Sequence, residues 1–244
     1  VTGFMSVGAK AAGFAALMRV FVTVFPSLSE DLTPILWALA AATMVVGNII
    51  AISQKNIKRL LAYSSIAQSG YMMMAFVPYA NAEVLSDTIA AMLFFLLAYS
   101  LTTFGAWAVI IEVEQQERHG LEIEDYAGLG RRHPGLGIAM TVFMLSFTGV
   151  PLTLGFWGKF YLFSTAVEGG FVGLALIGLL ASLVSAFYYL RVVVMMYMRT
   201  GDPPVKQNAW LNLTAVAAAL AVVGLAFIPG TLFNLALQAV LQLQ

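Results

Sequence analysis

Apolar runs of about 20 residues recur along the chain, and this repetition restricts the possible folds more than any other feature. A run of that length allows an α-helix to cross the hydrocarbon core of a bilayer. Of the 244 residues, 61% are hydrophobic and 10% are charged, whereas about 25% are charged in an average soluble domain. No segment shows the period-2 alternation typical of a membrane β-barrel. The sequence therefore predicts an all-α, polytopic helical membrane protein.

Seven membrane-spanning helices can be drawn, one of them interrupted by Pro151. They cover about residues 2–25 (ended by Pro26), 33–53, 57–78, 86–112, 135–167, 170–198 and 209–228. The 113–134 segment is the one long polar loop, and we expect it to be a solvated connector that holds both histidines, His119 and His133. In the 229–244 tail, Asn234, Gln238 and Gln242 recur every four residues, which predicts an amphipathic helix at the outer membrane surface.

The distribution of basic residues predicts the orientation. Nine Lys or Arg residues lie in or near the connections after the second, fourth and sixth spans, with Arg191 one to two turns inside the sixth span, and the other connections carry none. The nine are Lys55, Lys58, Arg59, Arg118, Arg131, Arg132, Arg191, Arg199 and Lys206. By the positive-inside rule, these connections are cytoplasmic. The net charge is zero and no basic patch is interleaved with aromatic residues, so nucleic acid is not an expected partner.

Lys159 lies in the apolar stretch GVPLTLGFWGKF, residues 149–160. A lysine near the bilayer centre costs about 2.5–3.5 kcal/mol, so a chain avoids it unless the charge is used. Gly149, Pro151 and Gly155 precede it, and proline with nearby glycines breaks a helix. Broken membrane helices are tolerated where the freed backbone groups face protein or water. The pattern is typical of ion sites in transporters.

A second lysine, Lys10, lies in the first span, too deep to reach the interface easily. A lysine buried in low dielectric loses much of its preference for the charged form, so it can gain and lose a proton near neutral pH. The alternative is that both lysines form buried ion pairs that hold helices together. The acidic residues all lie in loops or at the ends of spans, so a partner at membrane depth would have to come from outside this sequence. The proton-relay interpretation is therefore favoured for Lys10 and Lys159.

Two groups of polar residues could support such a relay. They are Ser64, Ser65, Gln68 and Tyr71 on one face of the third span, and Ser182 and Ser185 in the sixth. Polar side chains at membrane depth are costly, and hydroxyls can hold a file of water. The alternatives are interhelical hydrogen bonding for the first group and close helix packing for the second.

Three stretches resemble a known family. Residues 48–73, NIIAISQKNIKRLLAYSSIAQSGYMM, resemble the antiporter-like subunits of respiratory complex I and the related Mrp-type antiporters. Residues 125–163, DYAGLGRRHPGLGIAMTVFMLSFTGVPLTLGFWGKFYLF, narrow the resemblance to the subunit N family of NADH–quinone oxidoreductases, whose mitochondrial counterpart is subunit 2. AFYYLRVVVMMYM, residues 186–198, agrees. The resemblance implies the second half of a fourteen-helix fold, whose preceding half is not in this sequence.

The resemblance also implies residue roles. Lys10, in VTGFMSVGAKAAGFAALMRVF, matches the family's central lysine, and Lys159, in GFWGKF, matches its broken-helix lysine. The implied function is proton translocation driven by quinone reduction elsewhere in the complex. The complex would use NADH, FMN, iron–sulfur clusters and quinone, and this chain would bind none of them. Gln68 stands where several relatives have histidine, which puts a titrating group there in doubt.

The implied partners are the other membrane-arm subunits, including neighbouring antiporter-like subunits, and membrane lipid. The implied location is an energy-transducing membrane, the prokaryotic plasma membrane or an equivalent inner membrane. Two alternatives remain open at this stage. One is a subunit of an Mrp-type sodium/proton antiporter, and the other is a structural membrane scaffold of the complex.

Overall fold

The computed structural model describes the chain except for residues 1, 26–27, 115–119, 204, 207 and 242–244, and for the side chains at 2, 29, 30 and 241. Pro26, Arg118, His119 and Gln242, on which some predictions rest, lie outside the described residues. The described part is helical and contains no strand, which confirms the predicted fold class.

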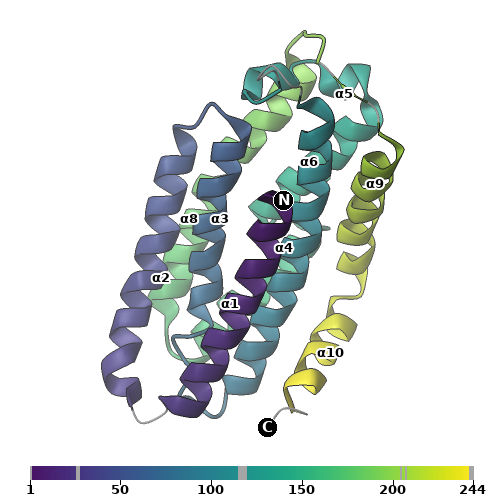
Figure 1. The fold of residues 1–244 in the computed structure, drawn as a ribbon. Coiled ribbons are helices and arrows are strands. Elements are labelled where there is room, and N and C mark those ends of the chain that lie inside the picture. Colours follow the sequence, from purple (N-terminus) through teal and green to yellow (C-terminus); the bar gives the residue numbers. More distant parts are fainter. Residues whose placement is uncertain (1, 26–27, 115–119, 204, 207, 242–244) are drawn as a thin grey trace.

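The long helices run up and down along a common direction (Figure 1). They are α1 (Thr2–Val24), α2 (Ser29–Ile52), α3 (Ile57–Met74), α4 (Leu85–Val113), α6 (Pro134–Thr148), α7 (Leu154–Glu168), α8 (Val172–Met198) and α9 (Ala209–Gly224). The shorter elements are η2 (Ile123–Tyr126), α5 (Leu129–Arg132), η3 (Leu225–Phe227) and α10 (Pro229–Leu241). Helix α4 is buried along most of its length and packs against α1, α6, α7, α9 and α10, so it is the centre of the bundle.

Five stretches are long and apolar enough to cross a membrane: Gly3–Val24, Asp31–Ile52, Leu85–Val113, Val172–Met198 and Ala209–Phe227. They match the first, second, fourth, sixth and seventh predicted spans. The third is α3, which carries two basic residues in its first turn and a polar face. The fifth is divided into α6 and α7, each of 15 residues, or about 22 Å of helix. Together these helices make a multi-pass membrane protein.

The 113–134 segment is not the solvated connector that the sequence suggested. Its described part folds back over the end of the bundle, where Ile123 N donates to Lys55 O and Ile57 N to Leu121 O, both at 2.8 Å. Ile123 is buried, as are Tyr126 and Leu129. Burial raises the pKa of Tyr126. The prediction was wrong because three apolar side chains spaced three residues apart cover the core.

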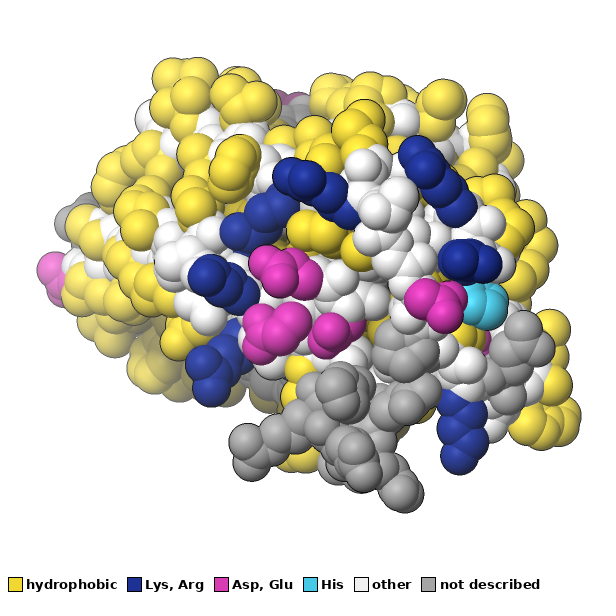
Figure 2. All heavy atoms as spheres, turned by 90° about the horizontal axis from the view of Figure 1, so that it is seen from above, with side chains coloured by type: hydrophobic (Ala, Val, Ile, Leu, Met, Phe, Trp, Pro, Cys, Tyr) yellow, Lys and Arg dark blue, Asp and Glu magenta, His cyan; other side chains and the backbone are white. Residues whose placement is uncertain are grey.

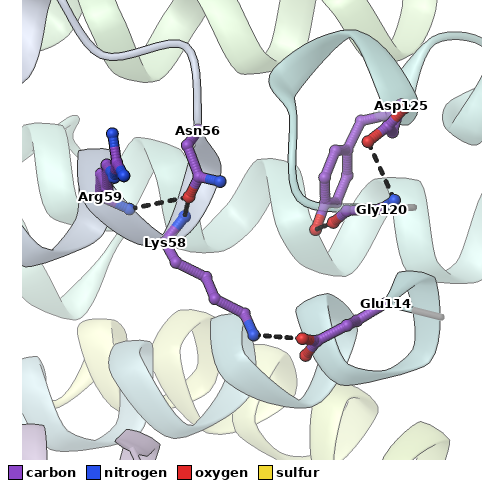
Figure 3. Close-up of polar contacts among 7 residues, drawn as sticks. Asn56, Lys58, Arg59, Glu114, Gly120 and Asp125 are labelled. Atoms are coloured by element: carbon purple, nitrogen blue, oxygen red, sulfur yellow. Dashed lines mark hydrogen bonds and ion pairs between the residues drawn. The ribbon is translucent and has the colours of Figure 1, made fainter. Parts of the chain in front are cut away.

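Polar contacts fasten this segment to the start of α3 (Figure 3). Asn56 Oδ1 caps α3 by accepting the backbone N–H of Lys58 at 3.0 Å. Lys58 in turn pairs with Glu114 at the end of α4. Asp125 Oδ2 accepts the backbone N–H of Gly120 at 2.9 Å, which closes the turn before η2.

The tail, expected to lie at the membrane surface, is observed as α10 and continues down the side of the bundle after η3 (Figure 1). It packs against α4, and the Phe233 ring stacks on Tyr161 of α7 at 4.3 Å. Asn234 and Gln238 are exposed, as the four-residue repeat predicts. The apolar side of α10 therefore covers protein in this structure.

Lys and Arg side chains, together with several acidic ones, gather at the end of the bundle that Figure 2 shows from above. The connections α2–α3, α4–α6 and α8–α9 meet at this end, which we call the basic end (Figure 1). Arg191 lies one helix turn or more inside α8 and donates to Ile52 O at 3.2 Å and to Gln54 O. It thereby holds the end of α2 against α8.

Candidate functional site

The Lys159 side chain is enclosed in the bundle, with 4% of its surface exposed. Its Nζ donates to the carbonyl oxygens of Phe147 and Thr148, each at 2.9 Å, and to Ser182 Oγ at 2.8 Å. An ammonium group has three donors and no acceptor. The three contacts therefore match the charged form of Lys159 without an ion pair; among the described residues, ion pairs involve other lysines and arginines only.

The helix break supplies two of these acceptors. Helix α6 ends at Gly149, whose φ of 87° is left-handed and suits a residue without a Cβ. The last carbonyls of a helix lack partners within the helix and carry its negative dipole end, so a cation is favoured beside them. Pro151 follows in the break, and α7 then returns Lys159 to the end of α6. The break thus builds a cation site from backbone.

The break also depends on Gly155, although this residue lies in the first turn of α7 and not between the helices. A Cβ at Gly155 would come within 2.0 Å of Ser146 O. Glycine is therefore required where α7 crosses the end of α6. The Lys159 Nζ also lies over the Tyr71 ring, 4.7 Å from the ring centre.

Lys10 occupies a second, more open site between α1, α3 and α4. Its Nζ donates to Ser65 O at 2.7 Å and Ser65 Oγ at 2.6 Å, and lies 3.5 Å from Tyr99 OH. The Tyr99 hydroxyl also donates to Ser65 Oγ at 3.0 Å. Tyr99 was missed in the sequence because it is a lone tyrosine in a long apolar helix, and its hydroxyl at membrane depth is the only signal.

Ser64 and Gln68 of α3 contact α8 and the end of α6. Gln68 Nε2 donates to Phe147 O and lies 3.3 Å from Tyr189 OH. Ser64 Oγ also bonds the Tyr189 hydroxyl. Gln68 and Lys159 therefore share the carbonyl of Phe147, and α3 contributes residues to both lysine sites.

The two serines of the sixth span have different surroundings. Ser182 bonds Lys159, and its hydroxyl also donates to Thr148 O at 2.9 Å. Ser185 Oγ donates to Ser182 O at 2.6 Å within its own helix. The structure therefore brings Ser182 to the lysine and leaves Ser185 outside the network.

Two cavities lie beside these groups, and the larger one reaches the basic end. The larger, of about 400 Å³, extends from Lys58 and Arg59 to Ser65 and Tyr99 beside the Lys10 site. The smaller, of about 10 Å³, is lined by Lys159 with eight other residues: Gln68, Phe95, Ala98, Tyr99, Thr102, Ser146, Phe147 and Gly155. That volume is close to the space one water molecule needs. Tyr99 thus borders the space next to each lysine.

Comparison with known proteins places this geometry in a family context. The family described as "NADH:quinone oxidoreductase/Mrp antiporter, TM" matches residues 1–185. Among curated relatives, NADH-quinone oxidoreductase subunit N of Trichlorobacter lovleyi is 46% identical over 98% of this chain and 48% of its own length. The subunit N of Bdellovibrio bacteriovorus is 41% identical over 96% of this chain and 48% of its own. The chain spans about half the length of the curated relatives it matches.

Solved structures show the same fold. A chain of respiratory complex I from Thermus thermophilus with bound aureothin is 37% identical, with a TM-score of 0.81 over 96% of this chain and 50% of that one. A chain of the archaeal membrane-bound sulfane sulfur reductase is 26% identical, with a TM-score of 0.84 over 98% of this chain and 48% of that one. A chain of the Mrp complex from Dietzia is 17% identical, with a TM-score of 0.82 over 93% of this chain and 50% of that one, a likeness of fold alone.

Proposed function

Since the chain belongs to the NADH:quinone oxidoreductase/Mrp antiporter transmembrane family, we propose that it is a proton-translocating membrane-arm subunit of an NADH–quinone oxidoreductase. One observation carries the proposal most directly. Lys159 is buried at the helix break, and its ammonium group is held by two carbonyls and one hydroxyl, with no carboxylate bonded to it among the residues that the structure describes. Burying a charge in this way costs free energy, and a residue with a purely structural role would avoid that cost.

The path we propose for the proton starts at the basic end. Water in the larger cavity delivers protons as far as Ser65 and Tyr99, next to Lys10. Tyr99 also lines the one-water space beside Lys159, so a single water there joins the two lysine sites. Lys10 and Lys159 carry the proton, and Ser65, Gln68, Tyr99 and Ser182 hold them and the water in place.

We place the basic end on the cytoplasmic side, because Lys and Arg concentrate there. Protons then move from the cytoplasm to the outer side through Lys10 first and Lys159 second. The redox reaction, with NADH, FMN, iron–sulfur clusters and quinone, belongs to other subunits of the complex. This chain's partners are neighbouring membrane-arm subunits and membrane lipid.

Two other functions compete with this one. An Mrp-type sodium/proton antiporter would use the same fold, and the likeness to the Dietzia Mrp chain supports that possibility at the level of fold. The curated relatives at 38–46% identity are named as subunit N, which favours the oxidoreductase. A structural scaffold is the third possibility, and it would tolerate an apolar residue at Lys159.

The deciding experiment is Lys159→Ala in the intact complex, in sealed membrane vesicles. NADH oxidation, uncoupler-sensitive proton uptake and complex assembly are recorded together. We expect assembly to be preserved and both coupled activities to fall sharply. Normal activities in the assembled variant would favour the scaffold, and proton uptake that requires sodium would favour the antiporter.

A further inference from the structure

The two cavities are separate, and two aromatic residues line both. Tyr99 of α4 and Phe147 of α6 border the larger cavity, which opens at the basic end, and also the one-water space beside Lys159. These two side chains therefore form the wall between a space that reaches the basic end and the buried ammonium group. Whether water crosses that wall depends on their rings.

The Phe147 ring is the apolar part of this wall. It lies nearly parallel to the Tyr189 ring at 5.4 Å and is tilted against the Tyr99 ring at 6.1 Å. Phe147 is 5% exposed. Its ring is thus inserted between tyrosines of α4 and α8, and unlike them it has no group that can bond water.

We propose that Phe147 is a gate that closes the basic-end cavity off from Lys159 and opens with the protonation state of Lys159. This inference rests on the proposed function, because it concerns when protons pass between the two lysine sites. It assigns a role to a residue whose side chain makes no hydrogen bond.

The backbone of Phe147 links its ring to the charge of Lys159. The carbonyl of Phe147 accepts a hydrogen bond from Lys159 Nζ at 2.9 Å, and its ring is the barrier. A charged Lys159 donates one hydrogen bond to each of three acceptors, Phe147 O, Thr148 O and Ser182 Oγ. A neutral amine has two hydrogens, so it must release one acceptor. Phe147 lies in the last turn of α6, two residues before the left-handed Gly149, so release there leaves its carbonyl held by the longer bond from Gln68 alone and loosens the end of the helix.

Lys10 is a second charge near this wall, since its Nζ lies 3.5 Å from Tyr99 OH, but among the described residues it bonds α3 and α4 and not the end of α6. The other titratable groups are tyrosines: Tyr71 of α3 lies against Lys159, Tyr99 of α4 lines the same small cavity, and Tyr189 of α8 stacks on Phe147. Among the described residues, no ion pair is formed at this site. The protonation state of Lys159 is therefore the charge change that acts on the end of α6.

The test uses the intact complex reconstituted in sealed vesicles, with Phe147→Ala and the milder Phe147→Leu. Phe143→Ala is the matched control, since Phe143 is also buried, lies one turn earlier in α6, packs on Gly105, and lines neither cavity. Passive proton conductance without NADH is measured first, and proton uptake per NADH oxidised second. We expect Phe147→Ala to raise the conductance on the order of tenfold, equivalent to about 1.4 kcal/mol of barrier, and Phe147→Leu to raise it less.

The leak should disappear when Lys159→Ala is added to Phe147→Ala, because the gated path ends at that lysine. Wild-type conductance in an assembled Phe147→Ala or Phe147→Leu complex overturns the gate, as does a leak that persists without Lys159 or that equals the one in Phe143→Ala. Failure of the proposed function gives a different result, since Lys159→Ala alone would then leave coupled proton uptake unchanged.

Discussion

The ammonium nitrogen of Lys159 lies over the ring of Tyr71, 4.7 Å from the ring centre. Burial removes water that would weaken this cation–π contact, and such desolvated contacts are worth about 2 kcal/mol or more. The hydroxyl of Tyr71 has no hydrogen-bond partner among the described residues. The ring, and not the hydroxyl, is therefore the part of Tyr71 that holds the lysine.

Substitution of Tyr71 should separate these two parts. Tyr71→Leu removes an attraction of about 2 kcal/mol on the ammonium, so we expect uncoupler-sensitive proton uptake to fall several-fold in assembled complex. Tyr71→Phe keeps the ring and should retain near-normal uptake. Equal losses in the two variants would show that the hydroxyl matters and would contradict the cation–π assignment.

Ser182→Ala should weaken the hold on Lys159 from the α8 side. A hydrogen bond to a charged group contributes about 1.5–3 kcal/mol, and the variant leaves one ammonium donor unpaired. We expect proton uptake per NADH oxidised to fall while the complex still assembles. Ser185→Ala is the matched control, because Ser185 bonds only its own helix; a larger effect there than at Ser182 would contradict the site described above.

Gly149→Ala should damage the helix break. The residue has a φ of 87°, and an added Cβ would lie 3.0 Å from the Lys159 Cδ atom. A left-handed conformation costs a residue with a Cβ roughly 1–2 kcal/mol, so we expect a lower midpoint of thermal unfolding and lower proton uptake. Gly135→Ala, near the start of α6 with nothing within 4 Å, should leave both unchanged or raise stability slightly. Similar losses at the two positions would argue against the break as the cause.

Arg191 should matter more for stability than the exposed ion pair at the same end. Its guanidinium holds Ile52 O and Gln54 O together, and a lysine cannot reproduce that fork. We expect Arg191→Lys to lower the free energy of unfolding by about 1.5–3 kcal/mol. Glu114→Gln breaks the partly exposed pair with Lys58 and should cost about 0–1 kcal/mol. A larger loss of stability in Glu114→Gln than in Arg191→Lys, measured by thermal unfolding in detergent, would contradict this comparison.

Much of the fold follows from local pattern. The five long apolar helices and the break near Pro151 can be read from runs of residues and from proline chemistry, which depend on neighbours in the chain. The 113–134 segment was misjudged, because its polar composition hides three apolar residues whose partners lie elsewhere in the sequence. The packing of α10 on α4 was missed for the same reason.

The candidate site, like the fold, can be predicted from the sequence only in part. Lys10 and Lys159 stand out in the sequence because a charge inside an apolar run is costly wherever the helix packs. Ser182 was a candidate on helical spacing, whereas Ser185, one turn later, could not be told from it. Spacing along one helix does not show which side chain meets a residue 23 positions away.

By itself, the sequence determined an all-helical membrane bundle, a broken helix and two lysines at membrane depth, because the transfer of each residue into lipid depends on its own chemistry. Only the tertiary structure decided what those lysines touch. The carbonyl of Phe147, the Tyr71 ring and Tyr99 reach the two ammonium groups through helices packed from distant parts of the chain. Such contacts depend on how whole helices pack against each other, and a local pattern does not contain that information.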